Sequence, residues 1–389
     1  MTARPVERDA IIAGTAQSAI GRRLHRPGLD LTIDAALGAI ADAGLRPSDI
    51  DGISTYPGSA GSFGGASGAE LHEALRLDLR WRDGASETSG QLGAVHKAAL
   101  AVAAGLARNV VVFRTVVEGS QRSGGVGARS GPLPQAFRFL LPYGAASPAN
   151  WVAFCAMRHM HEYGTTPEQL GAIAVNGRRN AALNPQAIYT DPLSLDEYLA
   201  SRLISDPLRL YDCDVPCDGS TAVVVSHRDL SGDLDHPAVG IHAMGTAIGP
   251  RPSWDQIEDL TTMPLAAAAR SLWARADVTP GDVDVAQIYD GFSWLTLAWI
   301  EALGFCGPGE AGAFVEGGSR IGPDGDLPLN SWGGQLSGGR LHGFGFLHEA
   351  VLQLRGEAGP RQVDGAEVAV VAAGGGPEVG ALLLTRGCA

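Results

Sequence analysis

The alternation of apolar and polar residues is clearest between residues 283 and 293, Val-Asp-Val-Ala-Gln-Ile-Tyr-Asp-Gly-Phe-Ser. This stretch is apolar at Val283, Val285 and Ile288, and an apolar run follows it, which predicts a buried strand that leads into a helix. Tyr289 and Asp290 then lie at the carboxyl end of the strand, the end that faces the ligand crevice in α/β sheets. The pair is a candidate for chemistry, although an aspartate at this place also serves to cap the next helix.

The same patterns predict an α/β chain with a helical stretch in its middle. Strands are expected at 10–18, 50–55, 110–117, 220–226, 238–248, 283–288, 367–373 and 381–385. Helices are expected at 31–45, 91–108, 151–163, 166–183, 263–275, 294–303 and 341–355. Glycine-rich loops are expected at 58–68 and 118–131, and residues 132–210 show little strand character.

The two ends of the chain repeat one pattern. Residues 41–56 align without gaps on residues 274–289. The shared positions are Pro47, Asp49, Asp51 and Tyr56, which recur as Pro280, Asp282, Asp284 and Tyr289. His96 is echoed in the same way by His348. A helix, a Pro-x-Asp-x-Asp turn and a strand that occur twice predict two similar α/β layers, packed on each other with one site between them.

Composition narrows the class of protein. The 389 residues are 45% hydrophobic and 18% charged, which is typical of a folded chain with a large core and not of a disordered one. No apolar run approaches the roughly 18 residues of a membrane span, and the N-terminus lacks an apolar signal core, so we expect a cytoplasmic protein. The net charge of −13 argues against a nucleic-acid surface. The five cysteines are scattered without paired metal-ligand spacing, so no metal is expected in this chain.

Three motifs resemble those of the thiolase superfamily. Residues 289–293, Tyr-Asp-Gly-Phe-Ser, occupy the place of the Asn-Glu-Ala-Phe-Ala motif. Residues 330–343 resemble Asn-x-x-Gly-Gly-x-x-x-x-Gly-His-Pro-x-Gly, and residues 372–376 match Cys-x-Gly-Gly-Gly. The resemblance covers nearly the whole chain and implies the α/β thiolase fold, two duplicated βαβαβαββ halves in a five-layered αβαβα sandwich. It places the halves at 1–230 and 238–389, with a helical insertion at about 118–210 in the first.

The residues that thiolases use for catalysis do not follow the motifs. A thiolase forms an acyl-enzyme on a cysteine thiolate that a histidine activates. Here the nucleophile position falls at about Leu92, the histidine position on Arg340 and the second cysteine position on Ala372. Ordinary thiolysis is therefore not expected of this chain.

What remains resembles the thiolase-like lipid transfer proteins related to the thiolase part of sterol carrier protein x, in which Tyr-Asp replaces Asn-Glu. Members that degrade steroid side chains are retro-aldolases, which cleave a β-hydroxyacyl-CoA into a ketone or aldehyde and a shorter acyl-CoA. They act beside a small partner with an OB fold and a zinc ribbon. The resemblance thus implies coenzyme A as part of the substrate, and a homodimer that forms a heterotetramer with such a partner. Related aldolases carry a tyrosine at the position of Arg340.

Retro-aldol cleavage needs a base for the β-hydroxyl proton, hydrogen-bond donors for the thioester enolate and an acid to protonate it. Tyr289 is our first choice as base or proton relay, with Arg340 as the nearby cation that a phenol needs to ionise at neutral pH. His342 is a candidate for the enolate donor or the acid, or else a packed histidine that fixes the glycine turn. Asp290 is expected to orient a neighbour rather than to transfer a proton.

Other candidates come from the glycine-rich motifs and the insertion. Gly374 and Gly375 are candidates to offer N–H donors to the thioester oxygen, or to form a tight turn between two strands. The candidate substrate contacts are Asn330, Gly333 and Gly334. The candidate contacts to the CoA phosphates are Arg158, Arg178 and Arg179. Ser89 and His96 form a weaker serine–histidine alternative, because no third partner can be identified.

Three functions remain open at this point. The first is a retro-aldolase that acts on a bulky, steroid-like β-hydroxyacyl-CoA. The second is an atypical thiolase or acyltransferase that uses another nucleophile. The third is a subunit without catalytic activity that binds acyl-CoA or sterol and scaffolds the zinc-ribbon protein.

Overall fold

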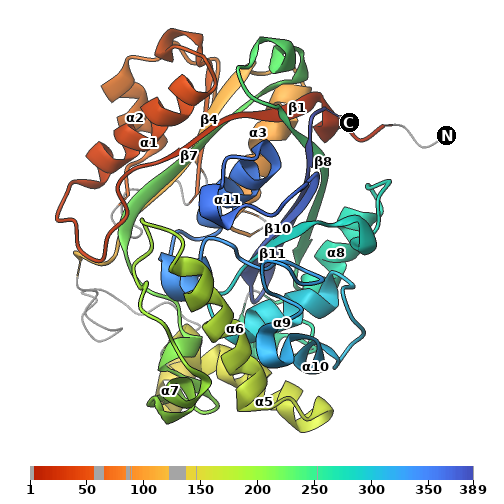
Figure 1. Cartoon of the computed structure of the whole chain (residues 1–389). Coiled ribbons are helices and arrows are strands. Elements are labelled where there is room, and N and C mark those ends of the chain that lie inside the picture. Colours follow the sequence, from red (N-terminus) through yellow and green to blue (C-terminus); the bar gives the residue numbers. More distant parts are fainter. Residues whose placement is uncertain are drawn as a thin grey trace.

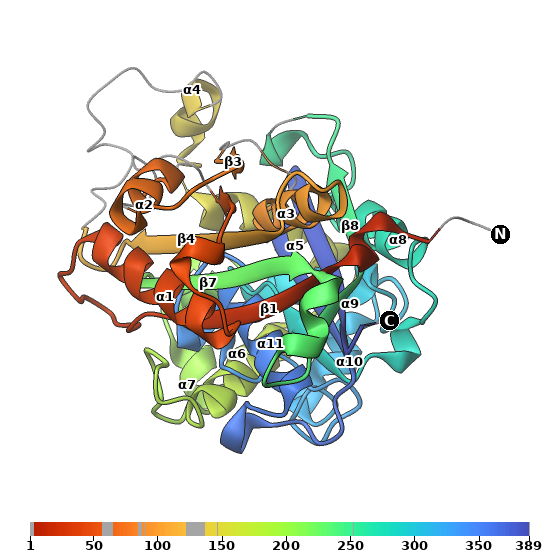
Figure 2. The ribbon, with the colours of Figure 1, turned by 90° about the horizontal axis from the view of Figure 1, so that it is seen from above.

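Nine strands form one mixed sheet in the described part of the chain, in the order β3-β2-β4-β7-β1-β8-β11-β10-β9. The structure is a computed structural model that describes residues 4–56, 65–84, 88, 90–121, 137–145, 147–251 and 253–388. The strands are β1 (Ala10–Gln17), β2 (Gly52–Thr55), β3 (Trp81–Asp83), β4 (Asn109–Val117), β7 (Asp218–His227), β8 (Val239–Ile248), β9 (Val285–Ile288), β10 (Val368–Gly375) and β11 (Glu378–Arg386). The first five and the last four come from opposite ends of the chain, and Figure 2 shows β4, β7 and β1 running side by side.

The sheet is two half-sheets that meet at a short seam. Between β1 and β8 the register pairs only Ile11 with Gly240 and Ile12 with Val239. Within the halves β2 pairs in parallel with β3 and β4, and β9 pairs in parallel with β10, whereas the remaining neighbours are antiparallel. The half-sheets can therefore turn their faces toward each other across a shared layer of helices.

The helices occupy three layers around the two half-sheets, as Figure 1 shows. Helices α3 (Gly93–Ala103) and α11 (Phe344–Arg355) lie between them, and α11 contacts strands of both. On the outer faces, α1 (Gly28–Asp42) and α2 (Gly68–Leu75) cover the first half-sheet. Helix α8 (Leu265–Trp273) covers the second, with α9 (Ser293–Ala302) packed beside it. The expected five-layered αβαβα arrangement is confirmed.

The burial of the central helices explains why their sequences carry apolar residues on nearly every side of the helix. A helix held between two sheets has no solvent face, so it cannot show the one-sided pattern of a surface helix. In α3 the buried positions are Gly93, Ala94, Val95, His96, Ala98, Ala99, Ala101 and Val102. Helix α9, which forms the apolar run that follows the strand at 283–288, is also buried, from Ser293 to Ile300.

The sequence repeat has a physical basis, because each half contains two aspartates that accept equivalent backbone hydrogen bonds. Asp49 Oδ2 accepts the Arg46 N–H at 2.9 Å, and Asp282 Oδ2 accepts the Thr279 N–H at 2.8 Å, so each closes the turn before its strand. Asp51 then accepts backbone N–H groups at the start of β4, and Asp284 accepts those at the start of β10. The same turn thus fixes β2 and β9 against their parallel neighbours.

Element boundaries differ from expectation where single residues have positive φ. The last long helix begins at Phe344 and not at 341, because His342 (φ 50°) and Gly343 (φ 88°) are not helical. Helix α3 ends at Ala103 and not at 108, two residues before Gly105 (φ 70°). The short α2 and β3 were not expected from the pattern.

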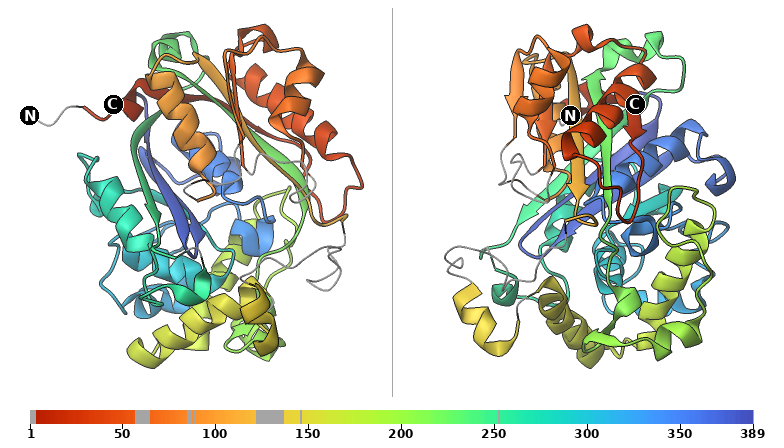
Figure 3. Two further views of the ribbon diagram at one scale, coloured as in Figure 1. Left: turned by 180° about the vertical axis from the view of Figure 1, so that it is seen from behind. Right: turned by 90° about the vertical axis from the view of Figure 1, so that its left-hand side faces the viewer.

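The segment between β4 and β7 is mostly helical, as expected. Its elements are α4 (Phe137–Leu140), α5 (Pro148–Tyr163), α6 (Pro167–Ala181), α7 (Leu195–Ala200) and a small hairpin of β5 (Leu203–Ser205) and β6 (Leu208–Arg209). In both views of Figure 3 these helices lie together at one end of the molecule. Helix α6 packs on α9 and on α10 (Ala311–Val315).

Some expectations fall outside the described residues. Most of the loop at 58–68 and of the glycine-rich connection at 118–131 lies there, as does Ser89. Among the helices that are described, none combines the length and the apolar character needed to cross a membrane.

Candidate active site

A cavity of about 450 Å³ opens where β2 and β9 end. Its lining is Tyr56, Gln91, Ser147, Pro148, Ala149, Ile204, Cys213, Asp214, Trp254, Tyr289, Phe292, Leu295, Arg340, His342 and Gly375. The two tyrosines of the sequence repeat, Tyr56 and Tyr289, therefore face one space. Three of the four residues expected to carry the chemistry line it as well, namely Tyr289, Arg340 and His342.

A cluster of charged side chains forms one wall of this cavity. The Arg340 guanidinium donates to Asp214 Oδ1 at 3.0 Å and forms a second ion pair with Glu118. Glu118 Oε1 also lies 3.0 Å from His342 Nε2. Burial would raise the pKa of Glu118, but the hydrogen bond from His342 and the charges of Arg340 and Arg114 outweigh it and lower the pKa to about 2. Glu118 is therefore ionised at neutral pH.

Tyr289 stays protonated in this environment. Burial raises the pKa of its phenol, and the nearby Asp214 carboxylate raises it further. The side chains of Gln91 and Gln335, and the charge of Arg340, oppose this shift only in part. The interpretation of Arg340 as the cation that lets Tyr289 act as a base therefore needs correction, because two carboxylates already neutralise the guanidinium. The phenol is suited instead to donate a hydrogen bond or a proton.

His342 is neutral, and its one ring proton is already used. Burial and the charge of Arg114 lower its pKa to about 4, despite the neighbouring Glu118. Because the ionised Glu118 can only accept, the imidazole must carry its proton on Nε2 and donate it there. The backbone N–H of His342 is donated to Gln335 Oε1 at 2.7 Å. The expected role of His342 as acid or enolate donor thus lacks a free ring N–H in this arrangement.

Asp290 lines neither this cavity nor the second one described below. Its carboxylate accepts the backbone N–H of Gln335 at 2.7 Å and, more loosely, that of Leu336 at 3.5 Å. A Cβ on Gly334 would lie 1.9 Å from Asp290 Oδ2, so only glycine permits this approach. Burial raises the pKa of Asp290 to about 8. Asp290 is thus placed to position Gln335 beside Tyr289.

The other glycine-rich residues mostly make contacts within the protein. Asn330 bonds both the N–H and the C=O of Ile288, at 2.7 and 2.8 Å, and so continues the edge of β9. Gly333 (φ 103°) packs against Ala181 of α6. Neither of them, nor Gly334, lines the cavity, so the expectation that they contact substrate has no support from this geometry.

The Gly374–Gly376 segment forms a turn that touches the cavity. It joins β10 to β11, as the turn interpretation expects. The Gly374 carbonyl accepts the Trp299 indole N–H at 2.9 Å, and the Gly376 N–H points to Met263 Sδ at 3.2 Å. Gly375 lines the cavity, so it is the member of this turn that a thioester could approach.

The positions of the thiolase nucleophile and second cysteine are apolar in this chain. Leu92, at the start of α3, and Ala372, in β10, are both fully buried in the core. His96 is buried too: burial lowers its pKa to about 4, and its Nε2 lies 3.2 Å from the Ala381 carbonyl. Cys213 is the cysteine that lines the cavity, and burial raises the pKa of its thiol to about 12.

We expect Cys213→Ala to leave catalytic turnover essentially unchanged. A nucleophilic cysteine must ionise, and the Cys213 thiol is held protonated beside two aspartates, Asp212 and Asp214. Steady-state kinetics of the variant, together with intact-protein mass spectrometry of the wild type during turnover, test this. An acyl adduct on Cys213, lost together with activity in the variant, would show that the chain is an acyltransferase.

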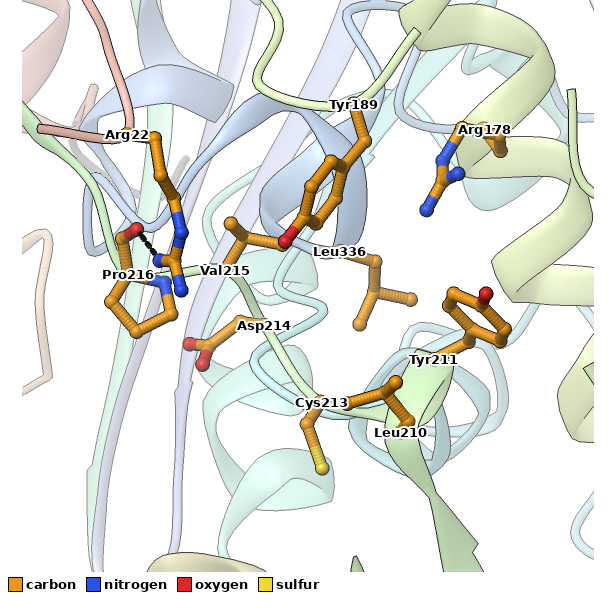
Figure 4. A pocket seen from close by; sticks show the side chains of 10 residues that line it. All are labelled: Arg22, Arg178, Tyr189, Leu210, Tyr211, Cys213, Asp214, Val215, Pro216 and Leu336. Atoms are coloured by element: carbon orange, nitrogen blue, oxygen red, sulfur yellow. Dashed lines mark hydrogen bonds between the residues drawn. The ribbon is translucent and has the colours of Figure 1, made fainter. Parts of the chain in front are cut away.

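A second cavity, of about 390 Å³, adjoins the first. Its lining is Arg22, Arg178, Tyr189, Leu210, Tyr211, Cys213, Asp214, Val215, Pro216 and Leu336. Figure 4 shows the Arg178 guanidinium near two aromatic rings, 5.0 Å from the centre of Tyr189 and 5.6 Å from that of Tyr211. Arg22 points into the same space from the other side.

Of the three arginines proposed to meet the CoA phosphates, Arg178 alone lines a described cavity. Arg158 forms an ion pair with Glu162 one turn along α5, and its side chain is 55% exposed. Arg179 donates to the Asn176 side chain. Neither of these two arginines is placed to bind a ligand in either cavity.

Sequence reasoning missed two carboxylates, Glu118 and Asp214. Glu118 follows β4 directly, and Asp214 stands in the segment 213–217 that leads into β7. Because β4 and β7 are antiparallel neighbours that pair Val117 with Asp218, both residues lie at the same end of this strand pair, and this placement was the available signal. Among the residues that the structure describes, no group of three or more histidine, cysteine or acidic side chains is arranged to hold a metal ion.

Two duplicated half-sheets have helices between them, and a cavity with one charged wall opens where β2 and β9 end. This arrangement defines a thiolase-fold protein. A family model described as "Thiolase C-terminal domain-like" matches residues 250–382. The chain is 37% identical to the "Steroid side-chain-cleaving aldolase" of Thermomonospora curvata, over 96% of this chain and 97% of that protein. It is 36% identical to the "17-hydroxy-3-oxo-4-pregnene-20-carboxyl-CoA lyase" of Mycobacterium tuberculosis, over 96% and 98%.

A solved structure, the "Ltp2-ChsH2(DUF35) aldolase", superposes with a TM-score of 0.89 at 35% identity and covers 97% of this chain and 98% of that one. The chain therefore belongs to the thiolase superfamily, within the thiolase-like subgroup that includes steroid side-chain-cleaving aldolases.

Proposed function

We propose that this chain is a carbon–carbon lyase that cleaves a bulky, steroid-like β-hydroxyacyl-CoA by a retro-aldol reaction, into a ketone or aldehyde and a shorter acyl-CoA. One observation carries the proposal. The chain has buried apolar residues, Leu92 and Ala372, at the positions where a thiolase has its cysteines, whereas Tyr289 and Arg340 line the cavity. Retro-aldol cleavage needs acid–base groups and no covalent nucleophile. The two relatives named as an aldolase and a CoA lyase support the same reaction.

Tyr289 is the proton donor of this proposal. Its phenol is protonated at neutral pH and faces the cavity, so it can stabilise the enolate and then protonate the α-carbon. Asp290 and Gln335 act behind it, since a carboxyl oxygen of Asp290 accepts the Gln335 backbone N–H and the Gln335 side chain lies beside the phenol. The Gly375 backbone borders the space that the thioester would occupy.

We assign the two cavities to the two parts of the substrate. The second cavity offers Arg178 and Arg22 to the CoA phosphates, while Tyr189 and Tyr211 give the adenine ring faces on which to stack. The first cavity offers Trp254, Phe292 and Leu295 to an apolar acyl group. The scissile bond would then lie where the cavities meet, beside Arg340.

We also propose a partner and an assembly. The solved relative is an aldolase that includes a ChsH2 DUF35 component. By that likeness, this chain would form a homodimer that binds a small zinc-ribbon and OB-fold protein, giving a heterotetramer. The division into halves at 1–230 and 238–389, with the insertion at about 118–210, remains part of this proposal.

The direct test is mass spectrometry of reaction products, with and without a zinc-ribbon partner protein. We expect a steroid-type β-hydroxyacyl-CoA to be cleaved without free CoA and without an acylated protein. A β-ketoacyl-CoA should remain intact when free CoA is added. Consumption of the keto compound that depends on CoA would make the chain a thiolase. Tight binding with no turnover in either arm, even with the partner, would make it a binding subunit.

A further inference from the structure

Asp214 lies where the two cavities meet. The two linings share only Cys213 and Asp214, so a substrate that extends through both cavities must pass these side chains. Backbone hydrogen bonds fix this position: the Asp214 N–H donates to the Gly291 carbonyl at 3.2 Å, and the Val215 N–H donates to the backbone carbonyl of Gln335 at 3.0 Å. These two bonds join the segment of Asp214 to the residues that follow β9 and to the glycine-rich motif at 330–343.

Arg340 holds the carboxylate of Asp214 in place. Its Nη1 donates to Asp214 Oδ1 at 3.0 Å, and the Asp214 side chain is only 7% exposed. The same guanidinium is bound on its other side by Glu118. The backbone N–H of Arg340 donates to the Val215 carbonyl at 2.8 Å, so a backbone hydrogen bond also joins the two segments.

Burial and the neighbouring charges together determine the pKa of Asp214. Burial raises its pKa most, the Arg340 charge lowers it, and the Glu118 charge raises it, with a result of about 7. Its own charge in turn raises the pKa of Tyr289 and of Asp290. Burial raises the pKa of the Cys213 and Cys217 thiols, and the charge of Asp214 raises it further, so both thiols are protonated at neutral pH.

The other titratable groups near the junction fit the role of base less well. Glu118 is ionised but is fully engaged by Arg340 and His342, and its low pKa makes it a weak base. His342 is neutral, but its lowered pKa of about 4 makes it a weak base too. Tyr289 carries its proton. A general base works best when its pKa lies near the working pH, and in the described lining Asp214 meets that condition.

We propose that Asp214 is the general base of the carbon–carbon cleavage, with Arg340 as the residue that positions its carboxylate at the scissile bond. This inference rests on the proposed lyase function. Asp214 takes the proton of the β-hydroxyl, and the O–H electron pair becomes the second bond of the new carbonyl. The bond between the α- and β-carbons breaks, and its electron pair passes into the thioester enolate. Tyr289 protonates the α-carbon, and the proton held by Asp214 returns to Tyr289 through solvent, which balances the cycle.

Asp214→Asn tests the proposal with the substrate that the wild type cleaves. We expect the kcat of the variant to fall by about 10²- to 10⁴-fold, as for loss of a general base. The Kd for a β-deoxy acyl-CoA, which has no hydroxyl to react, should change little. The wild-type kcat/KM should decline as pH falls below about 7, because the base becomes protonated, and this acid limb should vanish in the variant. Asp214→Glu should recover part of the rate with a displaced acid limb.

Asp212→Asn is the matched control. Asp212 is also a buried aspartate, two residues earlier, but it accepts hydrogen bonds from Tyr198 and Ser293 and lines neither cavity. The folded fraction of this variant should keep the acid limb of the wild type, whatever its loss of stability. Two results would overturn the assignment of Asp214 while leaving the proposed function in place, provided that the wild type cleaves the substrate. One is that Asp214→Asn keeps both the wild-type rate and the acid limb of its pH profile. The other is that Asp214→Glu leaves the acid limb at the wild-type pH. A wild type that cleaves no β-hydroxyacyl-CoA overturns the proposed function itself.

Discussion

Tyr289→Phe is expected to abolish most carbon–carbon cleavage while it leaves the fold intact. The ring would keep its edge-to-face contact with Phe346, whose centroid lies 6.2 Å away, so packing changes little. What is lost is the protonated O–H that lies in the cavity wall beside Gln91 and Gln335. Removal of a general acid typically lowers the rate by about 10²- to 10⁴-fold. Single-turnover kinetics with the β-hydroxyacyl-CoA, which separate chemistry from release, would measure it.

Tyr56→Phe is the control for this prediction. Tyr56 is the counterpart of Tyr289 in the repeat and lines the same cavity, but its ring lies under the Arg114 guanidinium, 5.4 Å from the centroid. We expect a much smaller loss of rate than in Tyr289→Phe. Equal losses in the two variants would mean that the cavity needs two hydroxyl groups and not a single acid.

The pH dependence separates the role of acid from that of base. With the pKa of Tyr289 raised by burial, the phenol stays protonated up to about pH 9, so with Tyr289 as the acid the rate should be flat between about pH 7 and about pH 9. If Tyr289 were the base, the wild-type rate would continue to rise with pH beyond 9. That result would restore the first interpretation of the sequence and would remove the proton donor from our mechanism.

The fold could be predicted from the sequence because its main determinants are local and occur twice. The turn aspartates Asp49 and Asp282 act on backbone groups three residues away, so their effect is written in the spacing. Burial of α3 and α11 between two sheets appears as apolar residues on all sides of each helix. The boundaries at His342 and Gly343 could not be predicted, because a positive φ at a histidine has no counterpart in the pattern.

The site could be predicted only where one motif supplies its residues. Tyr289, Arg340 and His342 belong to such motifs and do line the cavity. Their charge partners do not: Glu118 lies 222 residues from Arg340 in the sequence and Asp214 lies 126 residues away. Asp214 raises the pKa of Tyr289, and Glu118 accepts the ring proton of His342, so the two carboxyl groups influence where the protons lie. Without them the sequence indicated residues that line the cavity, and it favoured Tyr289 as the base, whereas we propose Tyr289 as the proton donor.

Arg340→Met is expected to destabilise the protein by about 3–5 kcal/mol, as is typical when one partner of a buried ion pair is removed. Glu118 and Asp214 would remain buried without their cation, since their side chains are only 9% and 7% exposed. Urea unfolding followed by fluorescence measures the loss. Arg26→Met is the control, because Arg26 pairs with Asp34 at 2.8 Å on the surface and such pairs contribute at most about 1 kcal/mol.

The loss in Arg340→Met should be larger at pH 8 than at pH 5. In the wild type the pKa of Glu118 is lowered to about 2, so its contribution to stability is complete above the unfolded value of about 4.5. Without the guanidinium, burial is opposed less strongly, so the pKa of Glu118 rises and that of Asp214, already raised to about 7, rises further. A carboxyl group with a raised pKa in the folded state lowers the free energy of unfolding as pH rises, because the unfolded chain releases a proton that the folded chain retains. Equal losses at the two pH values would show that Arg340 acts through packing and not through the charges of Glu118 and Asp214.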